Sequence, residues 1–308
     1  MAPAELVIRS ELPVDLRRTL GPLRYGGRWD PCVRVTADGV WRAARFPSGP
    51  ATMRLRSVAA DRVAVRAWGP GADEALEAAP DLIGAEDDDG GLGACASPTV
   101  RRLARRLPGI RLGRTGNPME ALVPTVIHQK VQTRAAATSY CAMVRAARSS
   151  APDPGIPAAP RLLLPPTAEW LIAQPSWAWH RWGIEAKRAL TIVTAATYAA
   201  RIGATVELAP AEALARLRVV PGVGAWTAAK VAAVAFGDPD AVSVGDYWLC
   251  HIVCHALTGQ ARGTDERMLE LLEVWAGQRG RVCRLLTAGG PALPRFGPRL
   301  ALQDITKI

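Results

Sequence analysis

Lysine is scarce in this chain of 308 residues: four of its 38 basic residues are lysine, and the other 34 are arginine. Phenylalanine and histidine are also rare, with three and four copies. No run of eighteen apolar residues occurs, so we expect no transmembrane helix and no membrane partner. The first residues, MAPAELVIRSELP, lack an apolar core, so we expect no signal peptide and a cytoplasmic location.

The six cysteines are scattered along the chain, which favours a reduced protein without a disulfide framework. The exception is the segment WLCHIVCHAL, where Cys250 and Cys254 lie one helical turn apart and alternate with His251 and His255. This spacing leaves two interpretations open. The segment is either a zinc-binding face or a buried helix, in which cysteine is common.

A formal net charge of +10 and a pI near 9.9 indicate an anionic partner. Arginine binds phosphate well, so a nucleic acid would fit this charge. A GC-rich genome would also enrich arginine and alanine, so the charge alone does not identify the partner. The length allows a full core and two domains, and a hydrophobic content of 49% fits a soluble globular protein.

Residues 1–90 have the pattern of an α+β domain. The Asp38-Gly39 pair between two alternating segments is a strong hairpin signal. The expected elements are, in order, a strand at 5–9, a helix at 14–20, strands at 33–36, 39–43, 51–58 and 63–68, and a helix at 72–79.

An acidic, glycine-rich run at 87–93 marks the clearest break in the chain. From 97 to 287 the chain is expected to be all helical, and Ser97 before Pro98 is a favourable helix start. A proline- and serine-rich stretch at 149–166 is predicted to be a surface loop, and 288–308 a tail without an assigned role. The expected helices lie at 99–107, 118–128, 131–148, 167–173, 176–182, 185–201, 211–218, 225–236, 246–257, 264–276 and 278–287.

The segment 217–236 contains a glycine-rich hairpin, Val220-Pro221-Gly222-Val223-Gly224, between two helical patterns. Pro221 cannot donate a backbone hydrogen bond and so ends the first helix. Gly222 and Gly224 permit a tight turn and the close approach of another backbone. The free N–H groups at the start of the following helix attract an anion such as phosphate. An ordinary corner between two helices would share this pattern.

The hairpin is followed by Trp226-Thr227-Ala228, and a carboxylate, Asp246, comes twenty residues after Trp226. This combination resembles the helix–hairpin–helix DNA glycosylases (HhH-GPD superfamily), especially those of the 3-methyladenine DNA glycosylase II type. The resemblance implies an α+β N-terminal domain with a TATA-binding-protein-like antiparallel sheet and two helices, followed by an all-α glycosylase domain at 97–287. It covers 97–287 well and 1–90 loosely.

By this resemblance, Asp246 is the catalytic carboxylate, which would stabilise an oxocarbenium-like sugar and orient or deprotonate water. It could also cap the helix that follows it. Asp238 and Asp240 lie in the same loop but do not abut a helix start, so they rank lower.

Trp226 occupies the position at which bifunctional members of the superfamily carry a nucleophilic lysine. The resemblance therefore implies a monofunctional enzyme without lyase activity, although Lys230, one turn further on, is a conceivable substitute. Trp226 and Tyr247 are candidates for the base pocket, and packing in the core is the alternative for each. The position of an additional pocket aromatic falls near Thr287, which is not aromatic. The nearby Trp248 and Trp275, like Tyr247, are expected to pack in the core.

The resemblance also implies a set of contacts with double-stranded DNA that contains a damaged base. The hairpin glycines and the Thr227 hydroxyl would hold a phosphate, and the 126–131 segment would enter the duplex. Its wedge would be Lys130, which departs from the usual apolar residue. The remaining implied residues are Gln129, Lys187 and Arg188 for DNA, and the backbone carbonyls of Arg218, Val220 and Val223 for a structural Na⁺ or K⁺.

No iron–sulfur cluster is expected, because only Cys283 lies late in the chain, whereas relatives with a cluster use four closely spaced cysteines. We expect a DNA-bound, nucleoid-associated monomer that releases a damaged purine, either alkylated or deaminated. The alternative is a non-catalytic protein that binds damaged DNA, and Lys130 and Thr287 favour that alternative. The sequence does not distinguish between the lesions.

Overall fold

The computed structural model describes residues 4–294, and the residues at 295–308 of the predicted tail lie outside this range. The N-terminal part is a five-stranded antiparallel sheet with the strand order β1-β5-β4-β3-β2. The Asp38-Gly39 hairpin is confirmed: Gly39 has a φ of +139°, and a Cβ there would lie 2.3 Å from the carbonyl oxygen of Leu55. The strands are β1 (Ala4–Arg9), β2 (Val33–Thr36), β3 (Gly39–Phe46), β4 (Gly49–Ala59) and β5 (Arg62–Trp68).

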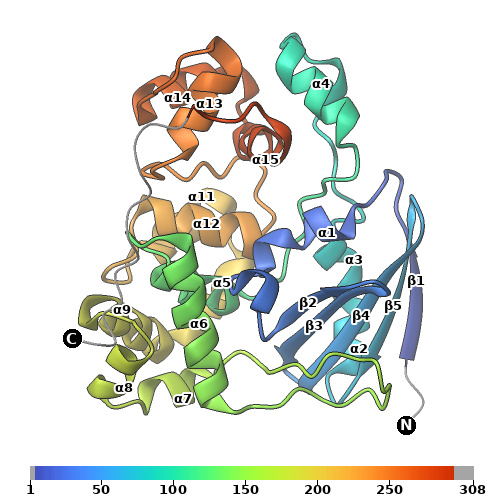
Figure 1. Cartoon of the computed structure of the whole chain (residues 1–308), viewed down its shortest axis with the longest axis vertical. Coiled ribbons are helices and arrows are strands. Elements are labelled where there is room, and N and C mark those ends of the chain that lie inside the picture. Colours follow the sequence, from blue (N-terminus) through green and yellow to red (C-terminus); the bar gives the residue numbers. More distant parts are fainter. Residues whose placement is uncertain (1–3, 295–308) are drawn as a thin grey trace.

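Short helices cover one face of this sheet (Figure 1). They are α1 (Leu16–Thr19), α2 (Ala72–Glu77) and α3 (Ala79–Ile83). A single helix had been expected at 72–79, but there are two, because Pro80 lacks a backbone N–H and starts a new helix. The α+β character of this part is confirmed, and the likeness of its sheet to that of the TATA-binding protein stays a prediction.

The opposite face of the sheet is covered by the 149–166 segment. We predicted a surface loop here, but Leu162 and Leu164 are 6% and 2% exposed and pack against Trp41. The backbone N–H of Ala151 donates to the carbonyl oxygen of Leu162 at 3.1 Å. The prediction was wrong for these two leucines, because the prolines around them suggested an exposed connection and hid the apolar residues in between.

The remainder of the described chain is helical, as predicted. The expected helix at 185–201 is interrupted at Tyr198, and the expected helix at 264–276 ends in a 3₁₀ turn. The α-helices are α4 (Pro98–Arg106), α5 (Pro118–Ile127), α6 (Thr133–Ala147), α7 (Ala168–Ile172), α8 (Ser176–Arg181), α9 (Ala186–Thr197), α10 (Ala199–Gly203), α11 (Pro210–Leu217), α12 (Ala225–Ala235), α13 (Leu249–Thr258), α14 (Asp265–Leu272) and α15 (Arg279–Gly289). The 3₁₀ helices are η1 (Gly21–Leu23), η2 (Gly27–Trp29), η3 (Leu92–Ala94), η4 (Ala204–Glu207) and η5 (Glu273–Trp275).

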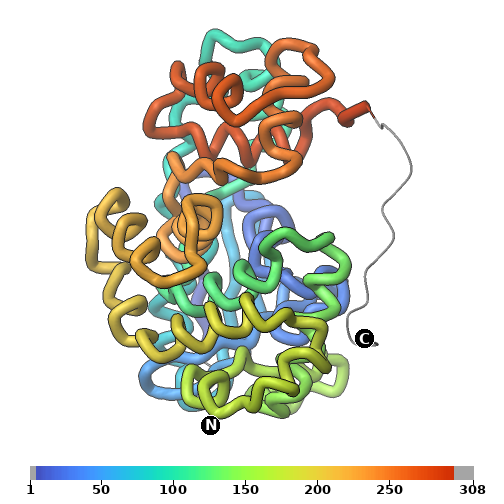
Figure 2. Tube along the Cα trace, turned by 90° about the vertical axis from the view of Figure 1, so that its left-hand side faces the viewer, coloured from blue at the N-terminus to red at the C-terminus, as the bar shows by residue number. Residues whose placement is uncertain are grey.

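Two large cores hold these elements together. The first joins the sheet to α5, α6, α9 and α12. The second is separate and consists of α4 packed with α13, α14 and α15, which lie at the top of Figure 1 and Figure 2. The helix α4 therefore contacts α15 although the two are far apart in sequence. The division at residue 90 remains a prediction about independent domains, since the first core includes residues on both sides of it.

Within residues 4–294, no single helix is long and apolar enough to cross a membrane. One bent pair, Ala186–Thr197 with Ala199–Glu207, would pass by length and composition, and it is bent by 80°.

Candidate active site

The hairpin between α11 and α12 has two glycines with different surroundings. Gly222 has a φ of +89°, and a Cβ there would lie 2.1 Å from the Oγ1 of Thr191 on α9. The protein's own packing thus requires glycine at this position. Gly224 precedes α12 with a φ of −91°, and a Cβ there would meet nothing within 4 Å. The space beside Gly224 is open, which leaves room for a ligand backbone to approach the start of α12.

Gln129, at the end of α5, ties the hairpin to the α5–α6 turn. Its Nε2 donates to the carbonyl oxygen of Gly222 at 2.9 Å and to the Oγ1 of Thr227 at 2.8 Å. Thr227 is 2% exposed, so its hydroxyl supports the hairpin from inside. In this structure both predicted DNA-binding side chains hold the hairpin in shape, and their contact with DNA stays a prediction.

Asp246 lies between α12 and α13 and uses both carboxylate oxygens. Its Oδ1 accepts the backbone N–H groups of Trp248 and Leu249 at 3.0 and 3.2 Å, which caps the start of α13. Its Oδ2 accepts the indole N–H of Trp226 at 3.2 Å and lies 3.1 Å from the Nζ of Lys230. One oxygen therefore supports the helix, and the other faces the side chains of α12.

Burial by itself would raise the pKa of Asp246. The Lys230 ammonium outweighs that effect, together with the hydrogen bonds from the Trp248 backbone and the Trp226 indole, and the net result is a lowered pKa. The carboxylate is thus held ionised near neutral pH, as required of a group that stabilises positive charge or accepts a proton from water.

Lys230 lies one turn after Trp226 on α12, so the two share a face of the helix. Its Nζ lies 5.7 Å from the centre of the Trp226 ring. Trp226 is half-buried, and its indole N–H is used by Asp246. The sequence had suggested Lys230 only as a substitute nucleophile, and the structure makes it the partner of the candidate catalytic carboxylate.

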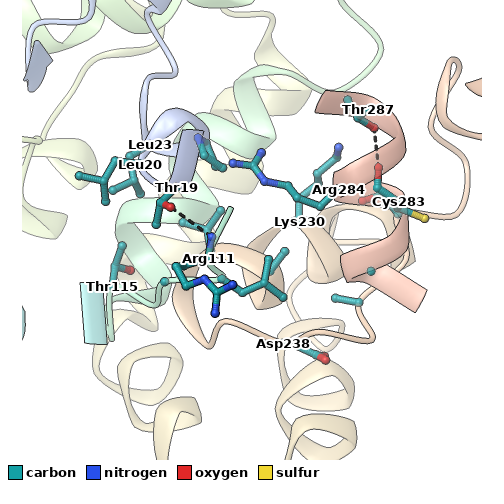
Figure 3. A pocket seen from close by; sticks show the side chains of 18 of the residues that line it. Thr19, Leu20, Leu23, Arg111, Thr115, Lys230, Asp238, Cys283, Arg284 and Thr287 are labelled. Carbon is teal, nitrogen blue, oxygen red and sulfur yellow. Dashed lines mark hydrogen bonds between the residues drawn. The ribbon is translucent and has the colours of Figure 1, made fainter. Parts of the chain in front are cut away.

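A cavity of about 200 Å³ adjoins this cluster (Figure 3). It lies between α1 and η1 on one side and α12 and α15 on the other, and both Lys230 and Leu249 line it. Thr287 also lines it, with its hydroxyl bonded to the carbonyl oxygen of Cys283 at 2.8 Å. Among residues 4–294, no aromatic side chain lines the cavity. Trp226 and Tyr247, the two predicted pocket aromatics, are therefore outside its lining.

Tyr247 and Trp248 are 74% and 56% exposed. Their rings meet edge to face, with the ring centres 4.9 Å apart. We expected both to pack in the core, and that expectation was wrong. They lie in the turn before α13, where Asp246 already caps the helix, and their side chains point away from the second core. Trp275 is partly buried against that core, as predicted.

The predicted phosphate-binding cations have different environments. Lys130 is exposed in the α5–α6 turn with a φ of +53°, an uncommon conformation for a residue other than glycine. Lys187 is exposed in the first turn of α9. Arg188 is only 5% exposed and donates to the carbonyl oxygen of Ile127 at 2.8 Å, which caps the end of α5. Its guanidinium is committed to the fold rather than presented at the surface.

Two other carboxylates lie in the loop between α12 and Asp246. Asp240 is paired with Arg279 at 2.5 Å, and the Oδ1 of Asp238 accepts the backbone N–H of Asp240 at 2.8 Å. Both are thus part of the loop's own hydrogen bonding.

The predicted alkali-ion ligands are carbonyl oxygens of the hairpin, which suit a hard monovalent ion. The oxygen of Val220 accepts the N–H of Val223 at 2.9 Å and keeps a second lone pair. Among residues 4–294, no three histidine, cysteine or acidic side chains are grouped to hold a metal ion. In particular, the Nδ1 of His251 accepts the N–H of Gly263 at 3.1 Å, so the zinc interpretation of this helix gains no support.

This two-part fold is shared with solved structures of DNA glycosylases. One solved structure with this fold is a 3-methyladenine DNA-glycosylase from Archaeoglobus fulgidus, with a TM-score of 0.78 and 17% identity over 92% of this chain and 97% of that one. An 8-oxoguanine glycosylase/lyase from Clostridium acetobutylicum, in complex with double-stranded DNA containing cytosine opposite 8-oxoguanine, has a TM-score of 0.69 and 13% identity over 93% and 97%.

A 3-methyladenine DNA glycosylase from Schizosaccaromyces pombe, in complex with abasic DNA, has a TM-score of 0.51 and 16% identity over 65% of this chain and 94% of that one. No protein-family model and no curated protein matches the sequence. At these identities the likeness establishes the fold, which the sequence motif had predicted.

Proposed function

We propose that this protein is a monofunctional DNA glycosylase of base excision repair, which flips out a damaged purine and hydrolyses its N-glycosidic bond. The observation that carries the proposal is Asp246. It is held ionised between α12 and α13, beside a cavity of about 200 Å³ and close to an open helix start at Gly224. The solved structures with this fold, which are glycosylases and in two cases complexes with DNA, support it.

The reaction needs the base outside the stack, a stabilised sugar cation and a water. Flipping costs a few kcal/mol, and bound backbone phosphates offset that cost. The amides at the start of α12 would hold one phosphate, and Lys130 and Lys187, both exposed, would hold others. As the C1′–N9 bond breaks, the Asp246 carboxylate would stabilise the positive sugar and accept a proton from the attacking water.

The lack of a lysine at position 226 supports the monofunctional assignment. Trp226 fills the position at which bifunctional members carry their lysine, and the Nζ of Lys230 is paired with Asp246 at 3.1 Å. An ammonium held in an ion pair has no lone pair with which to attack C1′. The expected product is an abasic site. We further propose that the protein acts as a DNA-bound monomer in the cytoplasm, with a hairpin Na⁺ or K⁺ in a structural role.

A non-catalytic protein that binds damaged DNA is the second candidate. It is favoured by the cavity lining, to which the described residues contribute no aromatic side chain on which a flipped base could stack, and by a lysine at the wedge position. It predicts tight binding to abasic duplexes without release of any base.

Base release from duplexes that contain methylated purines or hypoxanthine tests the proposal. Strand cleavage that appears only after alkali treatment would support a monofunctional glycosylase, whereas tight binding without release from any substrate would favour the second candidate.

The Asp246→Asn variant identifies the catalytic group. Asparagine is an equally good helix cap, so α13 should persist while base release falls by at least about 100-fold. DNA affinity should be retained, and activity near the unchanged protein's level would exclude Asp246 as the catalytic carboxylate.

A further inference from the structure

The cavity beside Asp246 is rich in positive charge. Its lining includes three cationic side chains, Arg111, Lys230 and Arg284, which come from three separate segments of the chain (Figure 3). Leucine side chains such as Leu20 and Leu23 supply apolar walls. A ligand in this cavity would therefore be held against apolar surface with cations close by, where the low dielectric strengthens each charge.

Arg284 on α15 contributes an unbalanced charge. Its guanidinium donates to the backbone carbonyl oxygen of Arg18, and no carboxylate within residues 4–294 forms an ion pair with it. Burial alone lowers the pKa of this guanidinium, which still remains protonated at neutral pH. Arg111 is bonded to the backbone oxygens of Asp87 and Pro108, and the nearby Asp87 carboxylate offsets part of its charge.

Negative and aromatic groups, which would favour a cationic ligand, are scarce in the cavity. Of the acidic side chains at 4–294, only Asp238 is in the lining. It lies apart from Arg284 in Figure 3, and burial raises the pKa of its carboxyl. The part of the chain that the structure describes supplies no aromatic ring to the lining for a cation–π contact. The Asp246 charge is already matched by Lys230.

Damaged purines differ in the charge that they bring into such a cavity. Purines alkylated at N3 or N7 are cations while attached to the sugar, and they leave as neutral molecules. Deaminated or oxidised purines are neutral and rich in carbonyl oxygens, and they leave with the electron pair of the glycosidic bond as anions unless they are protonated. Nearby cations repel the first class and stabilise the departing second class.

We infer that the cavity between α12, α15 and η1 selects neutral, carbonyl-bearing purines, deaminated or oxidised, over cationic alkylpurines, and that Lys230 assists their departure. This inference rests on the glycosylase function proposed above and specifies its substrate class. It follows from the Arg111 and Arg284 charges, from the lack of an aromatic side chain in the lining among residues 4–294, and from the ion pair that balances Asp246 with Lys230.

In this step the C1′–N9 bond breaks and its electron pair passes to the base. The Lys230 ammonium donates a proton to the departing base or stabilises its negative charge. Water forms the new bond to C1′ and gives its proton to Asp246, so the protons lost and gained balance. Lys230, which lines the cavity and contacts Asp246, is placed for both contacts.

Duplexes of one sequence that carry hypoxanthine, 8-oxoguanine or 7-methylguanine at a single position provide the test. For each, the single-turnover rate of free base release is divided by the spontaneous rate, because 7-methylguanine is intrinsically labile. We expect the enhancement for at least one neutral purine to exceed that for 7-methylguanine by about 100-fold, equivalent to about 2.7 kcal/mol. Equal or greater enhancement for 7-methylguanine would overturn the inference while leaving the glycosylase function in place.

Release of none of the three bases would overturn both the glycosylase function and the inferred substrate class. Failure of the substrate class alone is therefore distinct from failure of the glycosylase function. The Lys230→Gln variant then tests the residue itself, since glutamine keeps a polar group without the charge. We expect the ratio of neutral to cationic enhancement to fall about 10-fold or more. A merely structural role would lower both rates together and leave the ratio unchanged, which would overturn the role of Lys230.

Arg9→Gln is the matched control, because it removes one positive charge from the edge strand β1, where Arg9 is 84% exposed. The ratio of neutral to cationic enhancement in Arg9→Gln should equal that of the unchanged protein. Thermal unfolding of both variants confirms that each is folded.

Discussion

The Nζ of Lys230 lies 3.1 Å from the Oδ2 of Asp246, and the indole N–H of Trp226 reaches the same oxygen at 3.2 Å. Lys230 and Trp226 belong to α12 in the first core, whereas Asp246 caps α13 in the second. The pair therefore connects the two cores at the point where the proposed function requires a substrate sugar. Its charge state and its geometry both depend on how the cores meet.

Reduction with borohydride tests the absence of a lyase step. A duplex with a preformed abasic site should give no covalent adduct, because Lys230 is held as an ammonium beside Asp246. The Trp226→Lys variant places an amine at the position used by bifunctional members of the superfamily and should give a trapped complex on denaturing gels. An adduct with the unchanged protein would show that Lys230 is a nucleophile.

The two hairpin glycines should respond differently to alanine. Gly222→Ala forces a Cβ to within 2.1 Å of Thr191 at a φ of +89°, so the free energy of unfolding should fall by more than about 2 kcal/mol.

Gly224→Ala meets no atom of the protein and should change stability by less than about 1 kcal/mol, while DNA affinity falls by about 10-fold or more. Urea unfolding and fluorescence anisotropy measure the two effects. Unchanged DNA affinity in Gly224→Ala would mean that no DNA backbone approaches this site.

The exposed lysines should contribute to DNA binding through phosphate. Lys130→Ala and Lys187→Ala should each reduce the slope of log K against log salt by about one. Alanine and lysine have the same backbone strain at the φ of +53° found for residue 130, so stability should not change. Arg9→Ala, on the edge strand, is the control and should leave the slope unaltered. Slopes identical to that of the unchanged protein would remove these lysines from the interface.

His128 should make the fold sensitive to acid. Burial, then the nearby Lys230 and Arg188, lowers its pKa from 6.5 to about 4. Above pH 6.5 the contribution of His128 to the free energy of unfolding is fully present. Between pH 6.5 and 4 the unfolded chain takes up a proton that the folded chain refuses, so stability falls, by up to about 3 kcal/mol. His128→Phe keeps an aromatic ring beside Tyr25 and should remove this loss, as measured by urea unfolding across that range.

Another buried group acts in the opposite direction over part of the same range. Burial raises the pKa of Asp30 to about 6, so its contribution to stability is lost as the pH rises from about 4 to 6. Asp30 is present in both the unchanged protein and the His128→Phe variant. The difference between their free energies of unfolding therefore isolates the effect of His128. Parallel pH profiles for the two proteins would refute the assignment to His128.

Local signals in the sequence were sufficient to predict the sheet hairpins, most helices and the place of Asp246 just before α13. The Asp38-Gly39 turn, the Ser97 cap and the glycine hairpin each depend on a few adjacent residues, whose backbone preferences act without help from the remainder of the chain. The spacing of Trp226 and Lys230 also predicts that they share a helix face.

Contacts between distant segments had no such signal. The Gln129 amide reaches the hairpin across 93 positions to Gly222, and Arg284 joins the cavity from α15. The burial of Leu162 and Leu164 depends on packing against Trp41, more than a hundred residues earlier in the chain. Exposure of Tyr247 and Trp248 was missed because a large aromatic residue ordinarily favours the interior.

The early helix α4 packs against the neighbouring η3 and against helices near the other end of the described chain. During synthesis α4 leaves the ribosome long before α13–α15 are made. Until then, its apolar face cannot pack against these helices. Assembly of the second core therefore requires closure of a loop that contains most of the protein, which is an entropically slow event. A truncated chain that ends after α12 would keep the sheet and the first core intact, yet it would expose Val100 and Leu103 to water and to chaperones.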